Sequence, residues 1–182
     1  MLTLLRHSGS SGGEGFKVEA ALARPAPGRL ALTFVVSGPL HELILPEADE
    51  PRRTDELWRH TCLEAFVAPA EGASYYEFNF APSTRWAAYR LDSYRAGMAA
   101  PPIDTPRILA RRFAERLELE VGMSIHTEPA LASSHSWRVG VAAVLEDTAG
   151  RISYWALAHP PGKPDFHHPD GFALDLPVTD SQ

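Results

Sequence analysis

Three consecutive segments with the pattern of β-strands constrain the fold of this chain most strongly. They are TCLEAFVAP, SYYEFNFAP and TRWAAYRLD, which follow one another between residues 61 and 92. Only short turn-forming stretches, AEGA and PS, separate them. Because connections of about two to five residues join antiparallel neighbours, the three segments predict an antiparallel meander.

The remainder of the chain also has mostly strand character. Apolar and β-branched runs bounded by turn-forming residues predict further strands at 15–23, 29–38, 40–46, 117–125, 137–147 and 152–158. The segment RILARRFAERLELE is interpreted as two strands, or as one strand with a bulge, and TEPALASS as at most one helical turn. This spacing predicts an all-β fold, an antiparallel two-sheet sandwich of jelly-roll type with about nine or ten strands. We expect a single domain over residues 1–182, whose start over residues 1–14 can be flexible.

The composition narrows the classes of partner. The net charge of −6 argues against a nucleic-acid partner, because phosphate binding needs a basic footprint. No apolar run is long enough to cross a membrane, and the N-terminal stretch lacks the apolar region of a secretory signal. Cys62 is the only cysteine, which excludes an intrachain disulfide and fits a reducing compartment. We therefore expect no membrane partner and a cytoplasmic location.

Strand alternation sorts the central residues onto two faces. Successive strand residues point to opposite sides, so Glu64 shares a face with Phe66, and Glu77 shares a face with Asn79. Several strands thus carry an aromatic side chain beside a charged or amide group on one side. That side is either exposed to solvent or the floor of a concave polar site.

The stretch DELWRHTCLEAFVAPAEGASYYEFNFAPSTRWAAYR resembles the central region of the DOMON-like superfamily, which includes the family 9 carbohydrate-binding modules. The resemblance rests on Trp58, on Glu64 inside an apolar strand, and on YYEFNFAP at 75–82. It is closest to small stand-alone bacterial members of unknown role, which share the ending ISYWALAHPPGKPDFHHPDGFALDL. The resemblance covers residues 52–98 and 137–176, and it implies the same sandwich fold.

The resemblance also implies a ligand site. In the sugar-binding relatives the matching tryptophan and acidic residue face the ligand, which points to Trp58 and Glu64. A second aromatic closes a clamp around the sugar ring, and either Trp155 or Phe166 matches it. In those relatives an arginine after the hairpin supplies a polar contact, and Arg85 and Arg90 are the candidates for it here. Aromatic faces stack on sugar C–H groups, while carboxylate and guanidinium groups bond hydroxyls, so these residue types suit a sugar.

One departure from the relatives lies just before the acidic strand. Such modules often have Gly-Asp there, and this chain has His60 followed by threonine. The departure weakens the transfer of sugar specificity and of a structural calcium site. His60 is one of the candidate ligand-binding residues.

The stretch ALAHPPGKPDFHHPDGF, residues 156–172, is rich in proline and histidine. Its prolines remove backbone donors and stiffen the segment, which predicts a rigid loop. The loop either forms the rim of a pocket or covers a sheet edge, and it presents His159, Lys163, Asp165, Phe166, His167 and His168. The spacing His-x7-His-His matches no established metal motif, so we expect no metal.

The predicted function is a non-catalytic ligand-binding domain whose sheet holds a carbohydrate or another small polar ligand. The candidate ligand-binding residues are Trp58, His60, Glu64, Arg85, Arg90, Trp155, His159, Lys163, Phe166 and His168. No catalytic residue and no cofactor are predicted, although calcium and haem remain open, as does the oligomeric state.

Three alternatives stay open beside a binding domain. The first is a haem- or redox-type DOMON domain, for which Met98, Met123 and His159 are the available ligand types. The second is an enzyme built on the histidine-rich loop 159–168, or on Glu64 and Glu77 as a glycosidase-like pair of carboxylates. The third is a protein-interaction module, in which Trp58 would lie on an exposed apolar patch and not inside a cleft.

Overall fold

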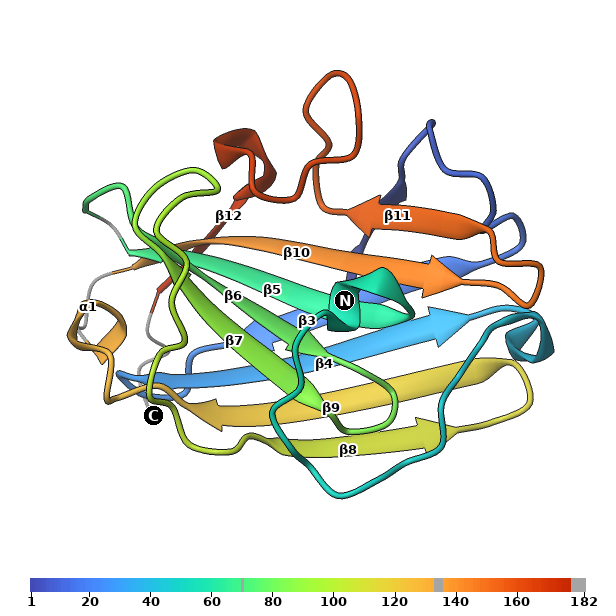
Figure 1. Ribbon diagram of the computed structural model, residues 1–182, viewed down its shortest axis with the longest axis horizontal. Coiled ribbons are helices and arrows are strands. Elements are labelled where there is room, and N and C mark those ends of the chain that lie inside the picture. The colour runs from blue at the N-terminus through green and yellow to red at the C-terminus, as the bar shows by residue number, and fades with distance from the viewer. Residues whose placement is uncertain (70, 133–135, 178–182) are drawn as a thin grey trace.

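The structure, a computed structural model, describes residues 1–69, 71–132 and 136–177. Within these residues twelve strands form two antiparallel sheets, most of whose strands are labelled in Figure 1. The five-stranded sheet has the order β1 (Leu2–Thr3), β3 (Lys17–Ala23), β4 (Arg29–Ser37), β9 (Arg116–Ser124) and β8 (Arg107–Arg112). The seven-stranded sheet has the order β2 (Leu5–Arg6), β11 (Ile152–Ala156), β10 (Trp137–Glu146), β5 (Cys62–Pro69), β6 (Tyr75–Phe80) and β7 (Trp86–Leu91), with β12 (Leu174–Leu176) also paired to β10. The predicted two-sheet sandwich and the meander β5–β6–β7 are confirmed.

Helical structure is sparse in the described residues. It comprises three 3-10 turns, η1 (Leu40–Glu42), η2 (Leu57–Arg59) and η3 (Pro169–Gly171), and the single turn α1 (Pro129–Ala132). None of these helices is long and apolar enough to cross a membrane.

Three features differ from the sequence-based expectations. The structure has more than ten strands because β1, β2 and β12 are only two or three residues long and have little pattern of their own. The segment 40–46 is not a strand: the amide of Leu43 donates to Leu40, which closes η1, and Leu43 keeps only an isolated bridge. Residues 2–6, expected to lie in a flexible start, pair with both sheets, and Leu4 between β1 and β2 is buried.

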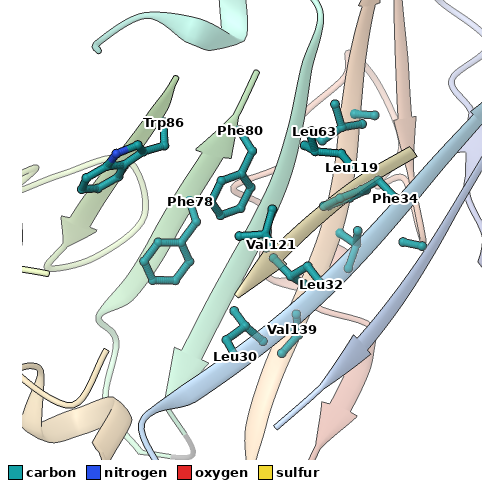
Figure 2. Packing of buried hydrophobic residues seen from close by; sticks show 14 of the residues in the cluster. Leu30, Leu32, Phe34, Leu63, Phe78, Phe80, Trp86, Leu119, Val121 and Val139 are labelled. Atoms are coloured by element: carbon teal, nitrogen blue, oxygen red, sulfur yellow. The ribbon is translucent and has the colours of Figure 1, made fainter. Parts of the chain in front are cut away.

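The main core fills the space between the sheets. Burial alternates along β4 and β9 because each sheet turns every second side chain toward the other. Figure 2 shows Phe78 and Phe80 of β6 pointing toward the apolar side chains of β4 and β9. Trp86 and Trp155 belong to the same buried cluster.

The outer face of the seven-stranded sheet, the face turned away from the five-stranded sheet, is covered by loops. All six residues of β6 and the first six of β5 are buried, so both faces of these strands are shielded from solvent. A second apolar cluster, which includes Phe66, Tyr89 and Phe172, lies on this outer face. Gly140 of β10 lets the chain approach closely here, since an added Cβ would lie 2.9 Å from the carbonyl oxygen of Gly171.

Candidate ligand-binding pocket

A pocket of about 830 Å³ opens on the outer face of the seven-stranded sheet. Its floor consists of side chains from β5, β6, β7, β10 and β11, and its walls come from three loop segments, 55–58, 95–100 and 164–167. The volume lies within the range of about 300–1,000 Å³ that is usual for small-molecule sites. The floor therefore consists of the outward-facing side chains of these strands, and loops from three parts of the chain enclose it.

Two glutamates provide the acidic part of the floor. Glu64 is only 2% exposed and Glu77 is also buried. Glu64 pairs with Asn79 across β5 and β6, and Phe66 pairs with Glu77 two residues further along, so the two carboxyls are diagonal neighbours on one face. The Asn79 side-chain amide donates to Glu77 Oε1 at 2.8 Å. Among the described residues, no group hydrogen-bonds to the buried Oε1 of Glu64.

Burial controls the protonation of these carboxyls. The pKa of Glu64 is raised well above its usual range, first by burial and then by the nearby charge of Glu77. Burial also raises the pKa of Glu77, although the hydrogen bond from Asn79 opposes the shift. The thiol of Cys62 behaves in the same way, because burial raises its pKa well above the usual value. These shifts favour a protonated carboxyl on the floor, which can donate a hydrogen bond as well as accept one.

Aromatic side chains form most of the remaining lining. They are Trp58, Phe66, Tyr89, Tyr154 and Phe166. Trp58 lies in η2 at the mouth and is 47% exposed, while the Arg59 guanidinium lies 5.2 Å from the centroid of its ring. The Tyr89 hydroxyl donates to Asp55 Oδ1 at 2.8 Å and so holds the segment that precedes η2 against β7.

The C-terminal loop is fixed to the loop that follows β7. Asp165 accepts from the Arg95 guanidinium at 2.8 Å and from the Tyr94 hydroxyl at 2.5 Å. Burial alone would raise the pKa of Asp165, but these hydrogen bonds outweigh burial and lower that pKa. The wall of the pocket is therefore held by contacts between residues that lie 70 and 71 positions apart in the sequence.

His167 connects the same loop to the floor. Its Nδ1 lies 2.7 Å from the Tyr75 hydroxyl, and its Nε2 lies 3.8 Å from Glu77 Oε2. Burial, and secondarily the positive charge of Arg95, lower the pKa of His167 to about 4. The imidazole is consequently neutral at neutral pH, and it contributes no positive charge to the pocket.

Three of the ten sequence-predicted site residues line the pocket: Trp58, Glu64 and Phe166. Trp58 and Glu64 therefore open onto one shared cavity. Of the two candidates for a second aromatic, only Phe166 is in the lining. Trp155 points to the inner face of β11, where it is 5% exposed, belongs to the core and donates to Ser153 Oγ at 2.9 Å.

Six further predicted residues lie outside the lining. Both arginines form ion pairs elsewhere, Arg85 with Asp49 and Arg90 with Asp92. Arg90 also lies on the same side of β7 as the core residue Trp86, which is the side away from the pocket. His60 is exposed and its Nδ1 lies 2.7 Å from Glu146. The remaining three all belong to the C-terminal loop.

These loop residues, His159, Lys163 and His168, do not converge. His159 Nε2 lies 2.8 Å from the carbonyl oxygen of Leu5, and burial lowers the pKa of His159. Lys163 is exposed, and His168 accepts from the backbone amide of Asp170 at the start of η3. The loop does form a wall of the pocket, but it does so through Pro164, Phe166 and His167.

Several lining residues were not among the predicted ones. Strand alternation had already placed Phe66 on the face of Glu64, and Glu77 on the face of Asn79, but it could not tell a covered pocket from an apolar cluster. Arg95 and His167 lie in loops, where no residue period indicates direction. Their position depends on the contacts of Asp165 and Tyr75 described above.

Three observations bear on a metal site, on the haem-type domain and on the protein-interaction module. No three His, Cys, Asp or Glu side chains are grouped to hold a metal ion within residues 1–69, 71–132 and 136–177. Of the residue types considered for haem, Met98 lines the pocket, whereas Met123 is buried in the main core. Trp58 borders a cavity and does not lie on a flat apolar patch.

Comparison with known proteins supports the fold. No protein-family model matches this sequence, and a search of curated proteins gave no match. The structure is similar to that of a candidate carbohydrate-binding protein from Bacteroides uniformis, with a TM-score of 0.70, 13% identity, and coverage of 98% of this chain and 84% of that one. It is also similar to a family 9 carbohydrate-binding module from Caldicellulosiruptor kristjanssonii. The glucose complex of that module gives a TM-score of 0.57 at 10% identity and covers 100% of this chain and 86% of the other. The cellotriose complex gives a TM-score of 0.52 at 12% identity, with coverage of 88% and 75%.

Proposed function

We propose that this protein is a non-catalytic carbohydrate-binding domain related to the family 9 modules, and that the pocket on the outer face of the seven-stranded sheet is its sugar site. The observation that carries the proposal is the shared cavity of Trp58 and Glu64. A half-exposed indole at the mouth offers an apolar face to sugar C–H groups. The buried carboxyls below it offer hydrogen-bonding groups to hydroxyls.

The fold likeness supports this choice of ligand. Two of the similar structures are complexes with glucose and cellotriose, in a module of the same sandwich architecture. Fold alone does not determine function, so the pocket chemistry has to agree with it. It does agree, because aromatic walls surround a small number of placed polar groups, and the volume of about 830 Å³ is large enough for a short oligosaccharide.

A binding titration with glucose, cellobiose and cellotriose tests the proposal. A ligand that binds the native state raises the unfolding temperature by mass action, so calorimetric titration and thermal unfolding report the same event. We expect at least one sugar to bind the native protein. The variant Trp58→Ala should lose that binding while it stays folded.

The matched control is Phe113→Ala. Phe113 is another exposed aromatic, at 50%, but it lies between β8 and β9 on the other sheet. This variant should bind sugars as the parent protein does. If no neutral or amino sugar binds at millimolar concentration, the carbohydrate proposal is wrong.

A further inference from the structure

We infer that the ligand of this pocket carries a protonated primary amine, and that Glu64 and Glu77 bind it. This deepens and rests on the proposed function, within which it makes an amino sugar with a free amine the preferred class of ligand. The inference stands on the charge of the lining, on one unpartnered buried oxygen and on the aromatic walls.

Carboxyl groups outnumber cationic side chains in the lining. Four carboxyl groups belong to it, Asp55, Glu56, Glu64 and Glu77, against one cationic side chain, Arg95. Arg95 is already paired with Asp165, and Glu56 with Arg59, so the lining carboxyls without a cationic partner are Asp55, Glu64 and Glu77. The potential inside such a cavity favours a cation over a neutral or anionic ligand, because low-dielectric walls focus the field of its charges.

Glu64 Oε1 supplies the specific contact. It is buried in the lining, and no group in the described part of the chain hydrogen-bonds to it. A buried acceptor without a partner costs free energy, so a ligand donor that reaches it gains more than an exposed contact would. Glu77 is its diagonal neighbour, and Glu77 Oε1 is already bonded to Asn79. When Glu64 is ionised, its Oε1 can therefore accept a hydrogen bond from a ligand donor.

A primary ammonium fits this arrangement better than other cations. It carries three N–H donors, so one group can bond to both carboxyls, and charge-assisted hydrogen bonds are stronger than neutral ones. A quaternary ammonium has no N–H and would leave Glu64 Oε1 unpaired. The aromatic rings of Trp58, Tyr89 and Tyr154 also attract a cation through their faces.

Proton release separates an amine ligand from a neutral sugar. Burial and the nearby charge of Glu77 raise the pKa of Glu64, which favours a proton on its carboxyl when no cation is bound. An ammonium replaces that proton, so its binding releases a proton and strengthens as pH rises, until the amine itself becomes neutral. A neutral hydroxyl leaves the proton in place, and its binding has no such rise.

The other groups that face the carboxyls do not reverse this expectation. The acidic ones are Asp55 and Glu56 before η2, while Asp165, outside the lining, acts on His167 and is paired with Arg95. The others are Arg95, the neutral His167 and Cys62, and the hydroxyl groups of Tyr75, Tyr89 and Tyr154. Burial raises the pKa of Cys62 and Tyr75 and lowers that of His167, so these three stay uncharged near neutral pH.

The test compares glucosamine, glucose and N-acetylglucosamine by calorimetric titration at pH 6, in two buffers of different ionisation enthalpy. We expect glucosamine to bind at least about tenfold more tightly than glucose, a ratio equal to about 1.4 kcal/mol. Its binding should also release protons, which appears as a difference in heat between the two buffers. N-acetylglucosamine, whose amide is neutral, should behave like glucose.

The variants Glu64→Gln and Glu77→Gln keep the shape of the floor and each replace one carboxyl, which can ionise, by an amide, which cannot. Either should bring the glucosamine-to-glucose ratio close to one, whereas Glu47→Gln, at an exposed position outside the pocket, should leave it unchanged. Binding of glucose as tight as that of glucosamine would overturn the amine inference and leave the carbohydrate proposal standing. Binding of none of the three sugars would overturn both.

Discussion

His167 lies against Glu77, with its Nε2 3.8 Å from Glu77 Oε2, while its Nδ1 meets the Tyr75 hydroxyl at 2.7 Å. One side chain of the C-terminal loop thus contacts both the acidic floor of the pocket and a residue on the same face of β6. The protonation of the His167 imidazole is therefore linked to the stability of the site.

Stability should fall as the pH drops from about 6.5 to about 4, because His167 resists protonation in the folded state. Its pKa is lowered by burial to about 4, whereas the pKa of an unfolded histidine is about 6.5. The unfolded chain therefore binds the proton first, which removes up to about 3 kcal/mol of stability across that window. In His167→Gln, denaturant unfolding at pH 7 and pH 4 should show a smaller loss than in the parent. The control His41→Gln, at an exposed position, should keep the parent's pH dependence.

Glu64→Gln should stabilise the protein at neutral pH. The raised pKa of Glu64 means that the folded state keeps a proton that the unfolded chain releases above about pH 4.5, so stability is lost as pH rises through that range. Glutamine does not ionise, so we expect the variant to be more stable than the parent at pH 7 and no more stable near pH 4. Equal unfolding free energies for variant and parent at pH 7 would contradict this prediction, because they would mean that the buried Glu64 carboxyl does not lower the stability of the fold.

Replacement by alanine should affect the free energy of unfolding strongly at Trp155 and weakly at Trp58. Trp155 is 5% exposed in the main core, so Trp155→Ala should lose about 3–5 kcal/mol of stability. Trp58 is half exposed at the mouth, so Trp58→Ala should change the free energy of unfolding by less than about 1 kcal/mol. Chemical denaturation of both variants measures the contrast, and a large loss in Trp58→Ala would place that indole among the structural residues.

Asp165→Asn should weaken ligand binding more than it weakens the fold. The carboxylate accepts from Tyr94 and Arg95, and its loss releases the wall that these contacts hold. Because its pKa is lowered, its contribution is present at neutral pH and is lost as the pH falls through the folded-state value. We expect a stability loss of about 1–2 kcal/mol and a several-fold lower affinity by titration. Asp175→Asn, exposed on β12, is the control and should alter neither.

Gly140→Ala should displace the C-terminal loop. A methyl group there would meet the carbonyl oxygen of Gly171 at 2.9 Å, which is closer than a Cβ can approach without movement. We expect a loss of about 1–3 kcal/mol. Gly122→Ala in β9 is the matched control, because nothing lies within 4 Å of the added Cβ, and it should be neutral or slightly stabilising in thermal unfolding.

The strand pattern determined the sandwich and the two faces of its central strands. Alternation placed Glu64 beside Phe66, and Glu77 beside Asn79, on the side where the pocket was found. That inference works because the period of two is local: each residue fixes the direction of the next through the geometry of the extended backbone. The resemblance to family 9 modules added Trp58, which has no such pattern.

Only the tertiary structure decided what covers that face. Arg95 and Asp165 are 70 residues apart, yet their ion pair holds the wall of the pocket, and no local pattern in either loop indicates this contact. For the same reason the sequence could not separate Phe166, which lines the cavity, from Trp155, which packs in the core. Strand direction follows from neighbouring residues along the chain, whereas the enclosure of a pocket follows from contacts between segments that the fold brings together.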